Sequence, residues 1–267
     1  MTTRPDDGGW ILRAGKLVRR LAARIPIVRG FANPWYRHHP LDRSLGIDTG
    51  GFLARDRLCA DSEARSHASD FAPSAPSLVR QALAMLPEPW RLNFVDLGCG
   101  KGRACAVATE FPFRAVIGIE LSPPLATIAR RNAKRIAARH KDRPEMRIIE
   151  GDALTAPLPE GDFAYYLFHP FDLTMVSELA RRIEARPGGG DYIVYCNPVH
   201  AAAFDACEGL TRHFAGMIPH DREDHGFAPD RDDGLIIWRS RALGVAAPEA
   251  QRKTVIFKNG GWRAELI

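Results

Sequence analysis

The sequence has few cysteines and no long apolar run. Its 267 residues contain five scattered cysteines, and no two of them form a Cys-x-x-Cys pair. They are Cys59, Cys99, Cys105, Cys196 and Cys207. This pattern argues against a zinc cluster or a disulfide framework, and we expect a protein of the reducing cytoplasm. Because no stretch of about 18 apolar residues occurs, no transmembrane helix is expected.

The excess of positive charge is confined to the N-terminus. Residues 1–31 hold seven of the 37 basic residues and two of the 32 acidic ones, so the remaining chain carries equal numbers of each. Apolar residues between Trp10 and Ile25 recur at helical spacing, which predicts a basic amphipathic helix. Residues 10–30 could contact a membrane surface or an acidic partner, could pack on the main domain, or could form a poorly ordered tail.

The chain is expected to have three parts. Residues 1–70 form a basic helix and a cap-like extension, residues 71–245 form the main domain, and residues 246–267 form a C-terminal extension. The pair His38-His39 suggests metal binding only weakly, because adjacent histidines point in different directions and no third ligand is placed by spacing. No metal is expected.

Apolar strands and amphipathic helices alternate along the main domain. This alternation predicts an α/β fold, a Rossmann-like, mostly parallel sheet of seven strands with helices on both faces. A charged loop at residues 220–233 joins two strand-like segments, which predicts an antiparallel pair at the sheet edge. The expected strands are 92–96, 115–120, 146–149, 163–168, 192–195, 213–218 and 235–238, with a further candidate at 254–257. The expected helices are 77–86, 101–110, 122–140, 172–186 and 201–208.

A glycine loop follows the first expected strand. Asp96 is followed by Gly98, Gly100 and Gly102, so the spacing is G-x-G-x-G. Dinucleotide enzymes use G-x-G-x-x-G, and the third glycine of that pattern is missing here, where Arg103 stands. A carboxylate at position 96 disfavours a pyrophosphate and favours a ligand with a positively charged amino group. An ordinary tight turn remains the alternative for the loop taken alone.

The stretch from Asp96 to Gly102 resembles motif I of the class I S-adenosylmethionine-dependent methyltransferases. The resemblance implies that Glu120 binds the ribose hydroxyls and that Asp152 meets the adenine amino group. Glu120 could instead be a solvated acid at a strand end, and Asp152 could only cap a turn. The cofactor-binding residues implied are Asp96, Gly98, Cys99, Gly100, Gly102, Glu120, Leu121, Asp152, Ala153 and Phe168, and the cofactor is S-adenosyl-L-methionine.

A narrower resemblance extends to four further segments. Residues 46–51, 95–103, 168–171 and 194–198 look like an uncharacterised bacterial methyltransferase group. That group is distantly similar to the histone-lysine methyltransferases that are not built on the SET fold. The similarity is strongest in the cofactor half of the domain and does not identify the methyl acceptor.

Two polar strand ends face the expected acceptor side. His169 stands where amino methyltransferases often carry Asn or Asp; it could act as a general base or bond a neighbouring loop. Asn197 follows the fifth strand and is the second catalytic candidate. We expect methyl transfer to a nitrogen of a protein or small molecule. The alternatives are an RNA methyltransferase, motivated by the basic stretch at 130–143, or a non-catalytic protein that binds the cofactor.

Overall fold

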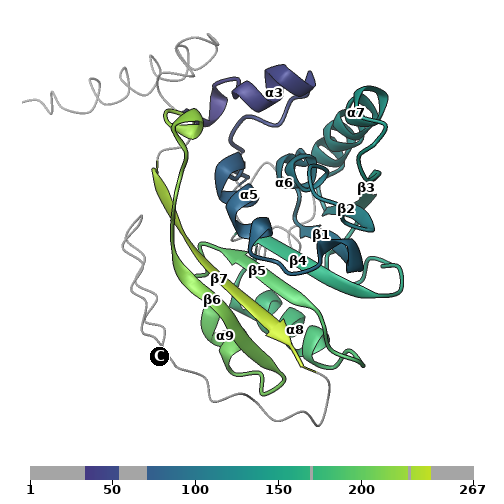
Figure 1. The fold of residues 1–267 in the computed structure, drawn as a ribbon, viewed down its shortest axis with the longest axis vertical. Helices are drawn as coiled ribbons and strands as arrows, with labels where there is room; N and C mark the ends of the chain where they lie inside the picture. Colours follow the sequence, from purple (N-terminus) through teal and green to yellow (C-terminus); the bar gives the residue numbers. More distant parts are fainter. Residues whose placement is uncertain (1–33, 54–70, 169–170, 228–229, 242–267) are drawn as a thin grey trace, which may run out of the picture.

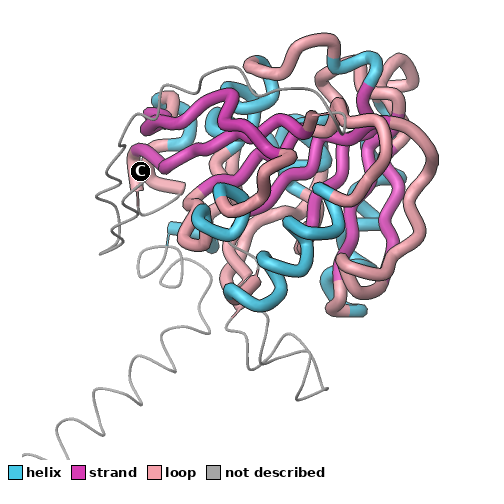
Figure 2. Tube along the Cα trace, turned by 90° about the horizontal axis from the view of Figure 1, so that it is seen from below, coloured by secondary structure: helices cyan, strands magenta, loops and turns pink. Residues whose placement is uncertain are grey.

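The computed structural model describes residues 34–53, 71–168, 171–227 and 230–241 (Figure 1). These residues form a seven-stranded sheet with helices on both faces (Figure 2). The strands are β1 (Leu92–Leu97), β2 (Ala115–Glu120), β3 (Met146–Glu150), β4 (Asp162–Phe168), β5 (Tyr192–Cys196), β6 (Leu210–Pro219) and β7 (Asp232–Ser240). The helices are α3 (Pro40–Leu45), α5 (Pro76–Ala84), α6 (Arg103–Ala108), α7 (Pro123–Arg139), α8 (Leu173–Glu184) and α9 (Ala201–Asp205), with 3-10 turns at Pro34–Tyr36, Pro89–Arg91 and Arg222–Asp224.

The strand order is β3-β2-β1-β4-β5-β7-β6. The first five strands run parallel, β7 pairs antiparallel with β5, and β6 pairs antiparallel with β7. The chain leaves β1 toward β2 and later returns to the other side of β1 with β4. The order of the strands therefore reverses between β1 and β4, and in such sheets ligands bind outside the carboxyl ends of the strands at this point.

Alternating side chains divide the core between the two faces of the sheet. Phe94 and Val95 are fully buried and belong to different clusters, as the two-residue period of a strand requires. One cluster joins the sheet to α3, α5, α6 and part of α7, and the other joins it to α8 and α9. The predicted fold class, a mostly parallel sheet with an antiparallel edge, is confirmed.

Several element ends differ from the sequence prediction. Helix α6 begins at Arg103 rather than 101, because Gly102 precedes it in a left-handed conformation with φ 84°. Strands β6 and β7 are longer than expected, since their ladder continues from Leu210–Ser240 to Pro219–Asp232 regardless of side-chain polarity. Helix α9 is shorter, and α3 was not anticipated. The expected helix near residues 10–25 and the strand at 254–257 lie outside the described residues.

Among the described helices, none is both long and apolar enough to cross a membrane.

The core beneath α9 provides a test of the fold. Trp238 of β7 is fully buried, its ring centroid lies 5.0 Å from that of Phe204, and its indole N–H donates to Asp205 at 2.9 Å. Trp238→Ala removes this packing and is expected to lower the free energy of unfolding by about 3–5 kcal/mol in urea denaturation. Trp90→Ala is the control, because Trp90 is 58% exposed. Equal losses in the two variants would contradict the position of Trp238.

Candidate functional site

The glycine loop makes a tight turn at the carboxyl end of β1. Its backbone N–H groups at Gly98 and Cys99 donate to the carbonyl of Ile119, the last residue but one of β2, at 3.0 and 2.9 Å. Gly98, Gly100 and Gly102 all have positive φ, between 55° and 85°. These values favour glycine; at position 102 a side chain would also displace the terminal methyl group of Met146. The loop is therefore fixed against the end of β2.

Asp96 lies at the end of β1 beneath this loop. It is 4% exposed, and the thiol of Cys105 donates to its Oδ2 at 3.7 Å. Burial raises the pKa of Asp96 to about 8; the thiol opposes this rise, and the nearby charge of Glu120 adds to it. Asp96 is thus a buried carboxyl group with one weak donor, which would gain from a cationic partner.

Glu120 ends β2 and holds the loop in place. Its Oε2 accepts the backbone N–H of Gly100 at 2.7 Å, and its Oε1 accepts that of Ser122 at 2.8 Å. Burial raises the pKa of Glu120, and these N–H groups oppose the rise. Glu120 is 8% exposed, so the alternative of a solvated strand-end acid is wrong. Each carboxylate oxygen can accept a further hydrogen bond.

The other cofactor candidates surround this edge of the sheet. Cys99 is buried within the loop, whereas Leu121 is 38% exposed directly after Glu120. Asp152 accepts the backbone N–H of Leu154 at 2.9 Å and the hydroxyl of Thr155 at 3.3 Å. Asp152 therefore caps a turn, as one of the two sequence interpretations held; its contact with adenine stays a prediction, as do the roles of Ala153 and Phe168.

The end of β5 carries a polar cluster. Asn197 adopts a left-handed conformation with φ 49°, and its Nδ2 donates to Asp233 Oδ1 at 2.7 Å. The other oxygen of Asp233 lies 2.7 Å from His220 Nε2. Burial alone would lower the pKa of His220, but the hydrogen bond and charge of Asp233, helped by Asp224, raise it. The carboxylate thus fixes which end of the Asn197 amide faces it.

Of the catalytic candidates, His169 lies outside the described residues. Asn197 lies one residue beyond Cys196, which pairs with Phe168 at the end of β4. The two catalytic candidates therefore follow paired residues of adjacent parallel strands. Phe171 packs against the α8 side of the core.

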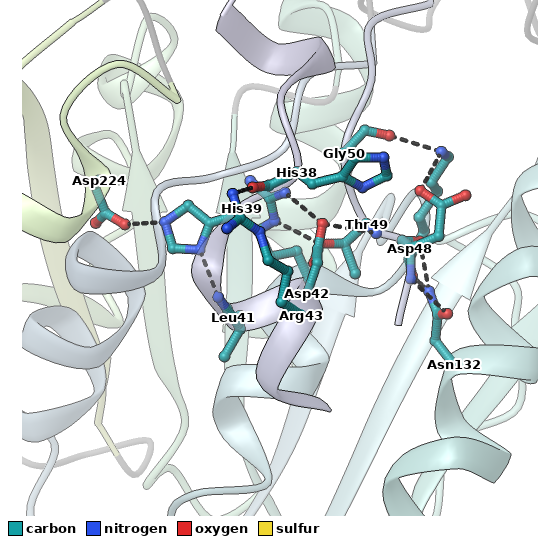
Figure 3. Close-up of polar contacts among 12 residues, drawn as sticks. His38, His39, Leu41, Asp42, Arg43, Asp48, Thr49, Gly50, Asn132 and Asp224 are labelled. Carbon is teal, nitrogen blue, oxygen red and sulfur yellow. Dashed lines mark hydrogen bonds and ion pairs between the residues drawn. The ribbon is translucent and has the colours of Figure 1, made fainter. Parts of the chain in front are cut away.

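Sequence reasoning missed a second polar cluster, which joins the N-terminal segment to the main domain (Figure 3). His39 Nδ1 accepts the backbone N–H of Leu41 at 3.0 Å, so its Nε2 carries the proton that is donated to Asp224 at 2.7 Å. Asp42 lies 3.4 Å from the guanidinium of Arg103. The histidines adjacent in sequence are thus used differently: the His39 side chain binds Asp224, whereas the backbone carbonyl of His38 accepts from Arg43.

Within the described ranges, no group of three or more His, Cys, Asp and Glu side chains could hold a metal ion.

Comparison with known proteins points to one class of enzyme. Residues 94–189 match a family model described as a methyltransferase domain. A segment covering 37% of the chain is 36% identical over 100 residues to the release factor glutamine methyltransferase of Escherichia coli (strain K12). A segment covering 32% of the chain is 33% identical to the demethylmenaquinone methyltransferase of Thermus thermophilus. The matches span about a third of each relative, 33% and 36% of their lengths.

Solved structures of low similarity include an RNA methyltransferase from Salinibacter ruber in complex with S-adenosyl-L-homocysteine. Its TM-score is 0.46 and its identity 21%, over 68% of this chain and 100% of that one.

The family match includes the glycine loop, Asp96 and Glu120. The stretch from 94 to 189 is thus similar to methyltransferase domains. For this stretch, the match agrees with the sequence prediction of a methyltransferase.

The buried carboxyl of Asp96 provides a test of the site in the free protein. Because its pKa is raised from 3.8 to about 8, the folded protein keeps a proton that the unfolded chain loses, and stability falls as pH rises through this window. Asp96→Asn removes the titrating group. We expect the variant to gain stability relative to the parent protein as pH rises from about 4 to about 8, measured by urea denaturation. Parallel pH profiles would contradict the raised pKa.

Proposed function

We propose that the protein transfers a methyl group from S-adenosylmethionine to a nitrogen atom of a protein or small molecule. The observation that carries the proposal is the pair of buried carboxyl groups, Asp96 and Glu120, at adjacent strand ends on either side of the glycine loop. S-adenosylmethionine offers an ammonium group and two ribose hydroxyls, which are partners that such carboxyl groups require. The residues present therefore fit this cofactor.

The cofactor, when bound, supplies a methyl group activated by the sulfonium. The chain's own contribution is to bind, to orient and to exclude water. Asp96 would hold the amino group and Glu120 the ribose, while Leu121 would pack against the adenosine. Each carboxylate oxygen of Asp152 already accepts one hydrogen bond, from Leu154 or Thr155. Asp152 would therefore bind the adenine amino group through a second lone pair on one of these oxygens.

Asn197 is the described residue best suited to orient the acceptor. Because Asp233 takes the amide N–H, the amide oxygen points away from the carboxylate and can accept a hydrogen bond from an acceptor nitrogen. An amine must present a neutral lone pair, so its proton has to leave before attack. His169 stays the candidate for that step. This arrangement suits an acceptor whose reacting atom carries a hydrogen-bond donor, as an amine nitrogen does.

The finer sequence resemblance belongs to this proposal as well. Similarity to the bacterial group related to non-SET histone-lysine methyltransferases is compatible with a protein amine as the acceptor but does not identify it. The relatives that match in sequence are named for a protein and for a small-molecule substrate, glutamine of a release factor and demethylmenaquinone.

The four described cysteines are free thiols, as suits the expected cytoplasmic location.

RNA is the less favoured acceptor. Three basic residues of the stretch from 130 to 143 are engaged within the chain: Arg130 pairs with Glu150, Arg135 donates to the carbonyl of Gly46, and Arg143 donates to Thr109.

Labelling of a cell lysate tests the reaction. The pure protein is incubated with methyl-labelled S-adenosylmethionine and lysate, and the products are separated into protein, RNA and small molecules. We expect label in protein or in small molecules. Label confined to RNA would overturn the acceptor class. Cofactor binding without any transfer would show a non-catalytic binding protein.

Calorimetry tests the two carboxylates separately. Asp96→Ala and Glu120→Ala are each expected to weaken the binding of S-adenosylhomocysteine by about ten-fold or more, since each removes a charge-assisted contact. Glu150→Ala is the matched control: Glu150 pairs with Glu120 in the β2–β3 register, but its partly exposed side chain binds Arg130. Unchanged affinity in the first two variants would remove them from the cofactor site.

The role of Asn197 predicts a different result. Asn197→Ala is expected to lower the rate of methyl transfer into the labelled fraction by roughly ten-fold or more, while the affinity for S-adenosylhomocysteine stays unchanged. Asp233→Asn should act in the same direction, because the amide of Asn197 loses the carboxylate that orients it. A wild-type rate in Asn197→Ala would exclude the residue from the acceptor site.

A further inference from the structure

A segment outside the matched domain is bound to the glycine loop. We call residues 46–53 the strap; this segment begins directly after α3 and ends at Leu53. Lys101, between two glycines of the loop, donates to Asp48 at 2.9 Å and to the carbonyl of Gly50 at 2.6 Å. Its side chain is 14% exposed, so this contact is largely shielded from water. The strap therefore touches the loop at its central lysine.

Buried polar contacts attach the strap more firmly beside the loop. Arg103, the first residue of α6, is 5% exposed and donates to the hydroxyl of Thr49 at 2.6 Å. That hydroxyl in turn donates to Asp42, which also faces the guanidinium. Thr49 is fully buried and Asp42 is 2% exposed. A buried arginine that is paired and hydrogen-bonded is costly to leave unpartnered, so this arrangement resists separation.

Asn132 of α7 joins the same parts from the other side. Its fully buried amide donates to the carbonyls of Asp48 at 2.7 Å and Lys101 at 3.0 Å. Its Oδ1 accepts the backbone N–H of Asp48 at 3.1 Å (Figure 3). One side chain thus forms hydrogen bonds with the backbone of both the strap and the loop.

The end of the strap fixes an aromatic ring on the loop. Leu53 and Phe71 exchange two backbone hydrogen bonds, at 3.1 and 2.8 Å. Phe52 stacks on Trp35 with ring centroids 5.4 Å apart, and its carbonyl accepts the hydroxyl of Tyr36. The ring of Phe71 lies so close to Gly100 that a Cβ at that position would overlap its Cδ2 and Cε2 atoms.

We propose that Phe71, held by the strap, forms one wall of the S-adenosylmethionine site. The inference rests on the proposed function and adds a residue that lies outside the matched domain. Gly100 lies between Glu120, which binds its N–H, and Phe71, which covers its Cα. A ligand held by Asp96 and Glu120 at this loop meets the ring of Phe71 at the loop's surface. The ring is half-buried and provides apolar contact area that the two carboxylates do not.

The ring also suits the charge of the cofactor. Aromatic faces attract cations, and S-adenosylmethionine carries an ammonium and a sulfonium. An apolar wall over Gly100 would exclude water from this part of the site and so strengthen the attraction of a carboxylate there for the ammonium. The strap then serves the cofactor site by fixing both the loop and the ring against it.

Calorimetric titration with S-adenosylhomocysteine tests the proposal. Phe71→Ala is expected to weaken binding by about ten-fold or more, because it removes the aromatic wall of the site. Phe71→Leu keeps an apolar side chain and should weaken binding by less. Thr49→Val keeps the shape of the side chain but removes the hydroxyl between Arg103 and Asp42, and it should weaken binding by several-fold. Ser44→Ala is the control, because the Ser44 hydroxyl donates to the carbonyl of Leu41 within α3 and has no other hydrogen-bond partner among the described residues.

The outcomes separate this inference from the proposed function. Absence of binding in the parent protein would overturn the proposed function and this inference with it. Binding in the parent protein together with unchanged or tighter binding in both Phe71→Ala and Phe71→Leu would overturn only the role of Phe71. Wild-type affinity in Thr49→Val would remove the strap from that role. Thermal unfolding without ligand identifies any variant that is unfolded, and Phe71→Leu then carries the test.

Discussion

The position of the glycine loop depends on the hydrogen bonds that the carboxylate of Glu120 accepts. This carboxylate accepts backbone N–H groups from Gly100 and Ser122, so one side chain joins the glycine loop, the end of β2 and the start of α7. Glycine residues with positive φ allow the loop to turn but do not hold it in one conformation. A buried carboxylate that satisfies two backbone donors supplies that constraint. The same group is thereby restricted in position before any ligand reaches it.

A second constraint comes from outside the matched domain. Helix α3 and the strap pack on α7 and bind the loop through Lys101 and Arg103. His39 extends this attachment to Asp224, at the tip of the β6–β7 hairpin, whose Oδ2 also accepts the backbone N–H of Ser77. The N-terminal segment therefore contacts both the cofactor loop and the hairpin near Asn197.

Local patterns in the sequence predicted the parallel strands and the carboxylates Asp96 and Glu120. Strand 115–120 is confirmed at both ends. The apolar pattern of the strands and the glycines that follow β1 are signals between residues close together in the sequence, so they can be recognised without the fold. The partners of Arg103 could not be predicted in the same way. Thr49 and Asp42 lie 54 and 61 residues away from it, and no spacing rule connects them. Asp224 is 185 residues from His39, and only the closed fold brings the two together. Arg103 gave one local signal, as a charged residue where a dinucleotide-binding loop carries glycine.

The carboxyl groups at the ends of β1 and β7 differ in how their charge is compensated, and this difference bears on what each can do. Asp96 has no cationic side chain against it among the described residues, and its pKa is raised. Asp233 is bound by His220 and by the amide of Asn197, and the pKa of His220 is raised in turn. A carboxyl group left without a cation is suited to a ligand that brings one, whereas a compensated carboxylate is suited to fixing a neutral neighbour. The end of β1 is therefore suited to bind a charged ligand, and the end of β5 holds the Asn197 amide in one orientation.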